Sequence, residues 1–217
     1  MSIEKQFLRA HASPSLSADG TAPAGWAKRL LDIGLGGAAL LAFLPVGLLV
    51  ALLIKLDSKG PVLFRQQRIG FNGRPFQIVK FRTLTVLEDG EAVTQVTPGD
   101  PRVTRIGHLL RRSGLDELPQ LLNVLAGDMS LVGPRPHALV HDDYYGSRIG
   151  NYAQRRRVRP GITGWAQVKG ARGATPTLAD MQERADLDAW YVDHRSLPLD
   201  LLILLLTPLE IILPARE

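Results

Sequence analysis

An apolar run over residues 30–54 limits what this chain can fold into more than any other feature of its sequence. The run holds 25 residues, and Asp32 is the only charged residue among them. A straight helix needs about 20 apolar residues to cross a bilayer, so the run is long enough to span one. Because it is apolar on every side, it is unlike the core helix of a soluble protein. We therefore predict a membrane helix over residues 26–58.

The centre and the flanks of this run argue against a simple crossing. Pro45 lies near the middle, where proline removes a helical hydrogen bond and clashes with the preceding turn. Cations flank both ends, with Lys28 and Arg29 before the run and Lys55 and Lys59 after it. Positively charged flanks favour the cytoplasmic side, and both flanks satisfy this if the helix bends at Pro45 and returns to the same leaflet. We predict this re-entrant helix-break-helix; the alternative is a spanning helix kinked at Pro45.

Composition narrows the choice of partners. The net charge of +5 suggests an anionic partner, such as a phosphorylated ligand or a phospholipid surface. Aromatic residues make up 6% of the chain and are not interleaved with basic residues, which disfavours nucleic-acid binding. The chain has no cysteine, which excludes disulfides, thiolate nucleophiles and thiolate metal sites.

The two ends of the chain differ in character. Residues 1–25 are polar, with several serines, glycines and prolines, and predict a flexible N-terminal extension. Residues 197–213 are strongly apolar but are interrupted by Asp200, Pro208 and Glu210. We predict that this second segment lies in or against the membrane interface rather than crossing the bilayer.

A β-hairpin is predicted after the membrane helix. Residues 62–69 and 75–82 are strand-like, and the Asn-Gly pair between them is a strong hairpin signal. Alternation along the second strand places Lys80 and Arg82 on one face. Two cations on a rigid strand could hold a diphosphate; the alternative is a solvated strand edge protected by charge.

Two adjacent carboxylates, Asp116 and Glu117, stand at the start of a predicted short helix. A preceding helix over residues 105–112 ends in arginines, including Arg111, and Arg135 follows between two prolines. Adjacent carboxylates among cations are what metal-assisted phosphate chemistry needs. The alternative is that they are ordinary capping charges at a helix start.

The spacing of leucines in this short helix predicts one buried face, and Gly127 is predicted to end the helix. The leucines in question are Leu118, Leu121, Leu122 and Leu125.

Two later features have open interpretations. Asp188 falls on the inner face of a helix that a capping box opens at Thr177, so it needs a cation, a metal or a donor. Its role is either catalytic or that of a buried ion-pair partner for an arginine. The basic run at residues 155–159 either meets anionic headgroups or is solvated.

Six stretches of the chain resemble motifs of the bacterial sugar transferases, the monotopic phosphoglycosyl transferases that start exopolysaccharide and O-antigen assembly. They follow family order between residues 26 and 207 and together are highly specific. The stretches are residues 80–82 (KFR), 100–107 (DPRVTRIG), 115–121 (LDELPQL), 127–136 (GDMSLVGPRP), 159–165 (RPGITGW) and 187–192 (LDAWYV).

This resemblance implies a UDP-sugar as donor and polyprenyl (undecaprenyl) phosphate as acceptor, with a hexose, glucose or galactose, as the expected sugar. Asp116 would take the sugar phosphate as nucleophile and release UMP, and the acceptor would then attack the covalent intermediate. Mg²⁺ would bind beside Asp116 and Glu117, which are thus both catalytic and metal-binding candidates. The substrate-binding candidates are Arg111, Arg135, Pro134, Pro136, Lys80, Arg82 and Asp188.

Taken together, these predictions describe an α+β, mostly helical protein of the bacterial cytoplasmic membrane. We expect a flexible extension (1–25), a re-entrant membrane helix (26–58), a cytosolic catalytic domain with a β-hairpin and interfacial helices (59–196), and an apolar interface segment (197–217). Membrane lipids are expected partners, and a homodimer is left open.

Two rival functions share some of these features. A membrane-associated, Mg²⁺-dependent phosphodiesterase or pyrophosphatase would use the same carboxylates with water as acceptor. A non-catalytic scaffold of a polysaccharide assembly complex would use the membrane helix but would not need adjacent carboxylates among arginines.

Overall fold

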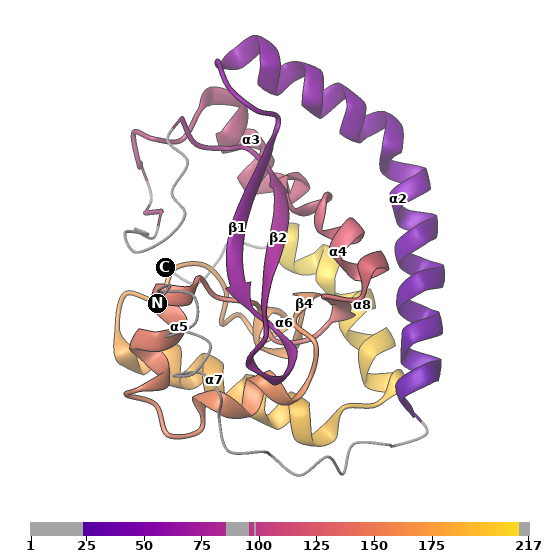
Figure 1. Ribbon diagram of the computed structural model, residues 1–217, viewed down its shortest axis with the longest axis vertical. Helices are drawn as coiled ribbons and strands as arrows, with labels where there is room; N and C mark the ends of the chain where they lie inside the picture. Colours follow the sequence, from indigo (N-terminus) through magenta and orange to yellow (C-terminus); the bar gives the residue numbers. More distant parts are fainter. Residues whose placement is uncertain (1–23, 86–95, 98, 213–217) are drawn as a thin grey trace, which may run out of the picture.

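The computed structural model of the chain describes residues 24–85, 96–97 and 99–212, and most of these residues are helical (Figure 1). The predicted extension over residues 1–25 therefore lies almost wholly outside the described residues, as do residues 213–217. The helices are α2 (Ala24–Asp57), α3 (Arg105–Ser113), α4 (Gln120–Ala126), α5 (Leu139–Gly146), α6 (Trp165–Val168), α7 (Leu178–His194) and α8 (Leu197–Ile212). Short 3-10 turns are η1 (Phe71–Gly73), η2 (Leu115–Glu117) and η3 (Tyr152–Arg157), and the strands are β1 (Leu63–Ile69), β2 (Pro75–Phe81), β3 (Ser130–Val132) and β4 (Gly161–Thr163).

Helix α2 is a single helix of 34 residues that bends part-way along its length (Figure 1). Pro45 is the proline inside it, and proline is a usual cause of such a bend. The prediction of a break at Pro45 is wrong, because helical structure continues through the proline. Judged by length and composition alone, α2 is the one helix among the described residues that could cross a membrane.

The first turns of α2 are held to the rest of the protein by charged side chains. The buried carboxylate of Asp32 accepts hydrogen bonds from the Ser130 hydroxyl and the Leu131 N–H, both at 2.9 Å. Lys28 forms an ion pair of 2.6 Å with Asp200 in α8. This half of the helix is therefore fastened to β3 and α8 in spite of its apolar sequence.

The last turns of α2 pack on the same body. Val50 and Ile54 are buried in a cluster with Phe81 of β2 and Leu110 of α3. Between the two fastened halves, residues 41–46 are all exposed, on every side of the helix. Both ends of α2 thus contact one domain, and the bend projects away from it.

The predicted hairpin is confirmed. β1 and β2 are antiparallel over seven residues each, and Leu63 pairs with Phe81 at the open end. The connection contains Asn72 in the left-handed region (φ 53°), which asparagine tolerates better than most residues.

Helix α4 lies across the hairpin and against the central core. The Asn123 side chain accepts a hydrogen bond from the Val79 N–H and donates one to the Gln77 carbonyl, which fixes α4 on β2. The core beyond it joins α4, β3, α7 and α8 through Val124 and its neighbours. The core residues are Ile78, Leu121, Val124, Met129, Leu131, Val132, Tyr191 and Ile203.

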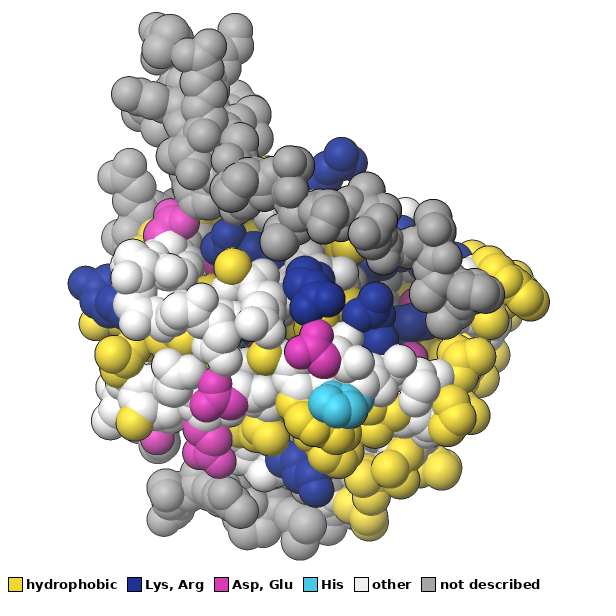
Figure 2. Space-filling model, turned by 90° about the horizontal axis from the view of Figure 1, so that it is seen from below, with side chains coloured by type: hydrophobic (Ala, Val, Ile, Leu, Met, Phe, Trp, Pro, Cys, Tyr) yellow, Lys and Arg dark blue, Asp and Glu magenta, His cyan; other side chains and the backbone are white. Residues whose placement is uncertain are grey.

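One leucine of α4 does not lie where its spacing predicts. Leu121 is buried, but Leu122 is 47% exposed, and Asn123 and Val124 take the inner positions instead. The exposed Leu122 belongs to a set of large apolar side chains that α2, α4 and α8 present outward. Figure 2 shows hydrophobic side chains gathered at the right-hand edge of the molecule, the side on which α2 runs in Figure 1.

The parallel pair of β3 and β4 positions the segment that follows β3. Gly133 and Gly161 allow the two backbones to approach closely, since a Cβ on Gly161 would lie 2.1 Å from the Gly133 nitrogen. This contact directs residues 134–136 back toward the hairpin. Helix α7 opens with the predicted capping box between Thr177 and Asp180.

Candidate active site

The carboxylates of Asp116 and Glu117 lie in a tight turn between two helices. Helix α3 ends at Gly114, which adopts the left-handed conformation (φ 71°) that glycine adopts without strain. The 3-10 turn η2 follows at once, and helical backbone continues through Leu118 and Pro119 into α4. The carboxylates thus precede the regular part of α4, which begins at Gln120 and not at the dyad itself.

Glu117 is neutralised by two cations. The Lys80 ammonium lies 2.8 Å from one carboxylate oxygen, and the Arg135 guanidinium binds both oxygens, at 3.1 Å for Nη1 to Oε2. Burial by itself would raise the pKa of Glu117, but Arg135 and Lys80 outweigh burial and hold the pKa below its usual range. Burial also lowers the pKa of Lys80, and the charge of Glu117 opposes this. Glu117 is therefore ionised, and both of its oxygens are already bound by cationic side chains.

Asp116 is in a different state. Its side chain is buried, with the residue 7% exposed, yet no residue within the described ranges forms a hydrogen bond with it. Burial raises the pKa of Asp116; the charges of Lys80, Arg135 and Arg111 oppose this, whereas the charge of Glu117 adds to it. A buried carboxylate without donors is stabilised by a cation placed beside it.

The dyad is suited to a magnesium ion that is held mainly by a substrate. Mg²⁺ takes oxygen ligands and is usually bound through one or two carboxylates together with substrate phosphates. The oxygens of Asp116 carry no hydrogen bonds, whereas those of Glu117 are already bound by Lys80 and Arg135. The described residues contain no group of three or more side chains that could hold a metal by themselves. Asp116 would accordingly be the better protein ligand for such an ion, and Glu117 is the second candidate.

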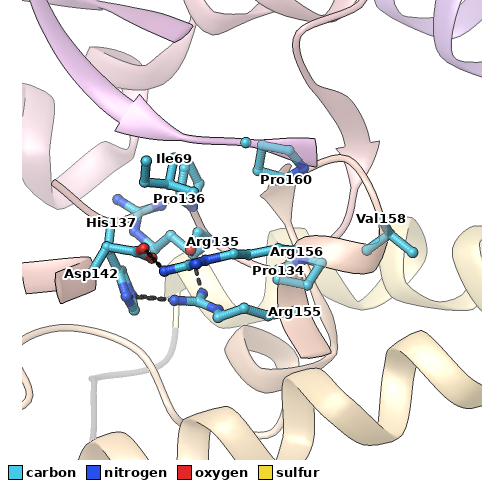
Figure 3. Close-up of a pocket in the computed structure, with 11 residues that line it drawn as sticks. Ile69, Pro134, Arg135, Pro136, His137, Asp142, Arg155, Arg156, Val158 and Pro160 are labelled. Atoms are coloured by element: carbon cyan, nitrogen blue, oxygen red, sulfur yellow. Dashed lines mark hydrogen bonds and ion pairs between the residues drawn. The ribbon is translucent and has the colours of Figure 1, made fainter. Parts of the chain in front are cut away.

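Arg135 is fixed by its backbone as well as by Glu117. Arg155 donates a hydrogen bond to the Arg135 carbonyl, and Arg68 of β1 donates one of 3.2 Å to the Pro136 carbonyl. Figure 3 shows Arg155 and Arg156 side by side beneath this segment, with their guanidinium groups directed toward His137 and Asp142. Arg155 and Arg68 thus fix the backbone of the segment that carries Arg135.

Arg155 is itself held inside the protein. It forms an ion pair of 2.9 Å with Asp188 of α7, and both side chains are almost completely buried. Its guanidinium also lies 3.0 Å from the Tyr152 hydroxyl and contacts the ring of His137. Burial, aided by the charge of Arg155, lowers the pKa of His137 well below its ordinary value, so this ring is neutral at pH 7.

A small pocket opens beside Arg135 (Figure 3). Its walls combine proline and aliphatic side chains with cationic ones. It is lined by Ile69, Gly70, Pro134, Arg135, Pro136, His137, Asp142, Arg155, Arg156, Val158 and Pro160. Arg135 lines the pocket and also binds Glu117, so the pocket and the dyad share this one residue.

The comparison with known proteins identifies the family. A family model described as bacterial sugar transferase matches residues 23–214. The chain belongs to this family.

The relatives of this chain include two that are named for a reaction and one that is named for exopolysaccharide production. A Caulobacter vibrioides protein, UDP-glucose:undecaprenyl-phosphate glucose-1-phosphate transferase, is 56% identical over 180 residues, which cover 83% of this chain and 67% of that protein. An Escherichia coli K12 protein of the same name is 50% identical, over 83% of this chain and 39% of its own length. The exopolysaccharide production protein PSS of Rhizobium leguminosarum is 48% identical, over 82% of this chain and 90% of its own. The chain thus spans about two fifths to nine tenths of these relatives.

The structure brings most of the predicted site residues of this family member together. Lys80 and Arg135 contact Glu117, Arg111 contributes its charge at Asp116, and Pro134 and Pro136 line the adjoining pocket. Arg111 also lies 3.5 Å from the Thr83 hydroxyl.

Two of the candidates serve other contacts. Arg82 is buried and donates hydrogen bonds to the carbonyls of Ser58 and Lys59, so the structure does not place it beside Lys80 at the dyad. It stands one residue beyond the end of β2, where strand alternation no longer determines its direction. Asp188 is the ion-pair partner of Arg155, which is one of the two roles left open for it.

Sequence reasoning missed Arg155, which it assigned with its neighbours to lipid headgroups or solvent. In η3 the register of the turn sends Arg155 inward, while Arg157 stays at the surface in an exposed pair with Asp193. Nothing in a run of consecutive arginines distinguishes the buried one, because the distinction comes from Asp188, which is distant in sequence.

Proposed function

We propose that this chain transfers a sugar 1-phosphate from a UDP-sugar to undecaprenyl phosphate. One observation carries the proposal: Asp116 is a buried carboxylate without hydrogen-bond donors, next to a Glu117 that two cations already neutralise. That asymmetry gives the two carboxylates different tasks, with Asp116 free to react and Glu117 holding the cations in place. Membership of the sugar transferase family and the names of its relatives support the same substrates.

The chemistry proceeds in two displacements at one phosphorus atom. A carboxylate oxygen of Asp116 attacks the phosphorus next to the sugar, an oxygen–phosphorus bond forms, and the bond to the departing UMP breaks. A phosphate oxygen of undecaprenyl phosphate then attacks the same phosphorus and releases the Asp116 carboxylate. Covalent catalysis of this kind divides a transfer between a soluble donor and a lipid acceptor into two steps.

The cations around the dyad stabilise the charge that these steps concentrate. Lys80, Arg111 and Arg135 lie close enough to affect the ionisation of Asp116, so they also act on a phosphoryl group bound there. Mg²⁺, bound through Asp116 and the diphosphate, would further neutralise the negative charge of the donor. The pocket beside Arg135 is the place for the part of the donor beyond the reacting phosphates.

The arrangement of α2 supports a re-entrant topology for this activity. Both ends of the helix contact one domain, through Lys28 and Asp32 at the start and through Val50 and Ile54 at the end. A helix that crossed the bilayer would separate those ends by about 30 Å of hydrocarbon. We propose that the exposed bend over residues 41–46 enters the cytoplasmic leaflet and that the dyad faces the headgroups from the cytoplasmic side.

For the sugar, we propose glucose. The two relatives that are 56% and 50% identical are both named for UDP-glucose, whereas an Aeromonas hydrophila relative named for N-acetylgalactosamine is 43% identical. A panel of UDP-sugars compared at equal concentration tests this choice directly.

The test of the proposed function uses the first displacement alone. The purified full chain is incubated with UDP-glucose and Mg²⁺ without acceptor, and its intact mass is measured together with UMP. We expect a sugar-phosphate adduct that maps to Asp116 and is absent from Asp116→Asn. Release of free sugar phosphate without an adduct would instead support a hydrolase, and no turnover of any donor would support a scaffold.

A further inference from the structure

The side chain of Gln120 is buried without a hydrogen bond. The residue is 1% exposed, and its amide nitrogen has no partner among the residues that the structure describes. Its amide oxygen makes no hydrogen bond within those residues either. Buried amides almost always have partners, because leaving the donor unpaired costs stability.

The neighbouring buried amide on the same helix behaves differently. Asn123 lies one turn beyond Gln120 and is also buried, yet both ends of its amide are bound by the backbone of β2. The interface between α4 and β2 can therefore provide hydrogen-bond partners for a buried side-chain amide. The unpaired state of Gln120 is a local property of its own position.

That position is one turn from the reacting carboxylate. Backbone from Leu115 to the end of α4 is helical throughout, so residues three and four apart share a face. Gln120 is three residues after Glu117 and four after Asp116. Long side chains on a helix lean toward its N-terminus and cover the preceding turn, which here is the turn that carries the dyad.

From this we infer that the Gln120 amide N–H donates a hydrogen bond to a phosphoryl oxygen of the donor while that phosphate reacts at Asp116. The inference rests on the proposed function and adds a substrate-contacting residue to it. An uncharged donor suits this position, because it orients the phosphate without adding to the charge of Lys80 and Arg135. Binding of the donor supplies the partner that the amide otherwise lacks.

The experiment replaces the amide with an apolar side chain of the same length. Gln120→Met is compared with wild type for its melting temperature and for kcat/KM with UDP-glucose, and Asn123→Leu serves as the matched control. We expect Gln120→Met to melt at or above the wild-type temperature while kcat/KM falls by about tenfold or more. Asn123→Leu should melt at a lower temperature, because it leaves the Val79 N–H and the Gln77 carbonyl unpaired.

The opposite pattern overturns the inference. If Gln120→Met transfers sugar phosphate at the wild-type rate, the amide does not contact the donor. If it melts well below wild type and retains wild-type kcat/KM per folded molecule, Gln120 has a structural partner instead. Gln120→Leu repeats the measurement with a branched side chain if methionine is not accommodated.

The same assays separate this inference from the proposed function. A wild-type protein that transfers nothing from any UDP-sugar overturns both. A wild-type protein that transfers normally, together with an equally active Gln120→Met, overturns only the role of Gln120.

Discussion

Arg155 and Asp188 form a 2.9 Å ion pair that is almost completely shielded from solvent and stands directly behind the active site. Arg155 donates to the carbonyl of Arg135, whose guanidinium binds Glu117. The contact between η3 and α7 is thereby connected to the dyad through one residue. Removing a single partner of a buried ion pair is strongly destabilising, because the remaining charge has no compensation.

Asp188→Asn is therefore expected to lower the free energy of unfolding by about 3 kcal/mol and to slow transfer by the protein that remains folded. The matched control is Asp193→Asn on the same helix, which breaks the exposed pair with Arg157 and should cost less than about 1 kcal/mol. Urea unfolding and transfer assays measure both effects. Equal losses for the two variants would contradict the positioning role of Asp188.

The pH dependence of transfer follows from the state of Asp116. In the proposed mechanism Asp116 attacks as a charged carboxylate, and burial raises its pKa above the ordinary value of 3.8. Activity should therefore fall as the pH drops through a value higher than that of an ordinary aspartate. Lys80 opposes this shift, so Lys80→Met should move the acid limb of kcat/KM to higher pH, whereas Lys59→Met at the surface should leave it in place. A limb that moves to lower pH in Lys80→Met would contradict the assignment of Asp116.

Arg135 and Arg82 should respond differently to the same substitution. Arg135→Gln removes a donor that binds Glu117 and that the proposed mechanism also directs at the substrate phosphates, and we expect kcat/KM to fall by about 10²- to 10³-fold. Arg82→Gln removes donors from the carbonyls of Ser58 and Lys59, and we expect it to lower stability by about 1–3 kcal/mol with KM unchanged. A raised KM for UDP-glucose in Arg82→Gln would place this side chain in the substrate site after all.

The topology of α2 can be tested by cysteine labelling, because the chain contains no cysteine of its own. Gly25→Cys and Lys59→Cys should both react with a membrane-impermeant reagent from the cytoplasmic side, and Leu44→Cys should be protected from it. All three positions are exposed in the protein itself, so protection at Leu44 would come from lipid. Labelling of Gly25→Cys and Lys59→Cys from opposite sides would establish a spanning helix.

Chelation of Mg²⁺ should abolish transfer without changing the melting temperature of the protein without substrate. In the proposed mechanism the ion would be held together with the donor phosphates, and the described residues contain no group of three ligands that could hold it by themselves. A clear fall in melting temperature on addition of EDTA would reveal a structural metal instead. The measurement needs only a thermal shift assay and an activity assay on the same sample.

Local patterns predicted the parts of this structure that depend on neighbours in sequence. The Asn-Gly turn, the capping box at Thr177 and the glycine at the end of α4 each determine their own backbone, and each lies where it was predicted. The same holds for the adjacency of Asp116 and Glu117 to cations. These features needed no knowledge of tertiary contacts.

The predictions that were wrong concern side chains whose direction is set by residues distant in sequence. Leu122 has the spacing of a core residue but faces outward, because Asn123 binds β2 and sets the rotation of α4. Arg82 and Lys80 belong to one strand pattern, yet the carbonyls after α2 hold Arg82 and Glu117 holds Lys80.

The ion pair between Lys28 and Asp200 has a consequence for the order in which the protein is made. The two residues are 172 positions apart, so a ribosome completes almost the whole catalytic domain before the lysine meets its partner. Chain growth at about 5–20 residues per second makes this an interval of several seconds or more. Until α8 has been made, Lys28 lacks its Asp200 partner, so this ion pair between α2 and α8 can form only after the intervening segment is complete.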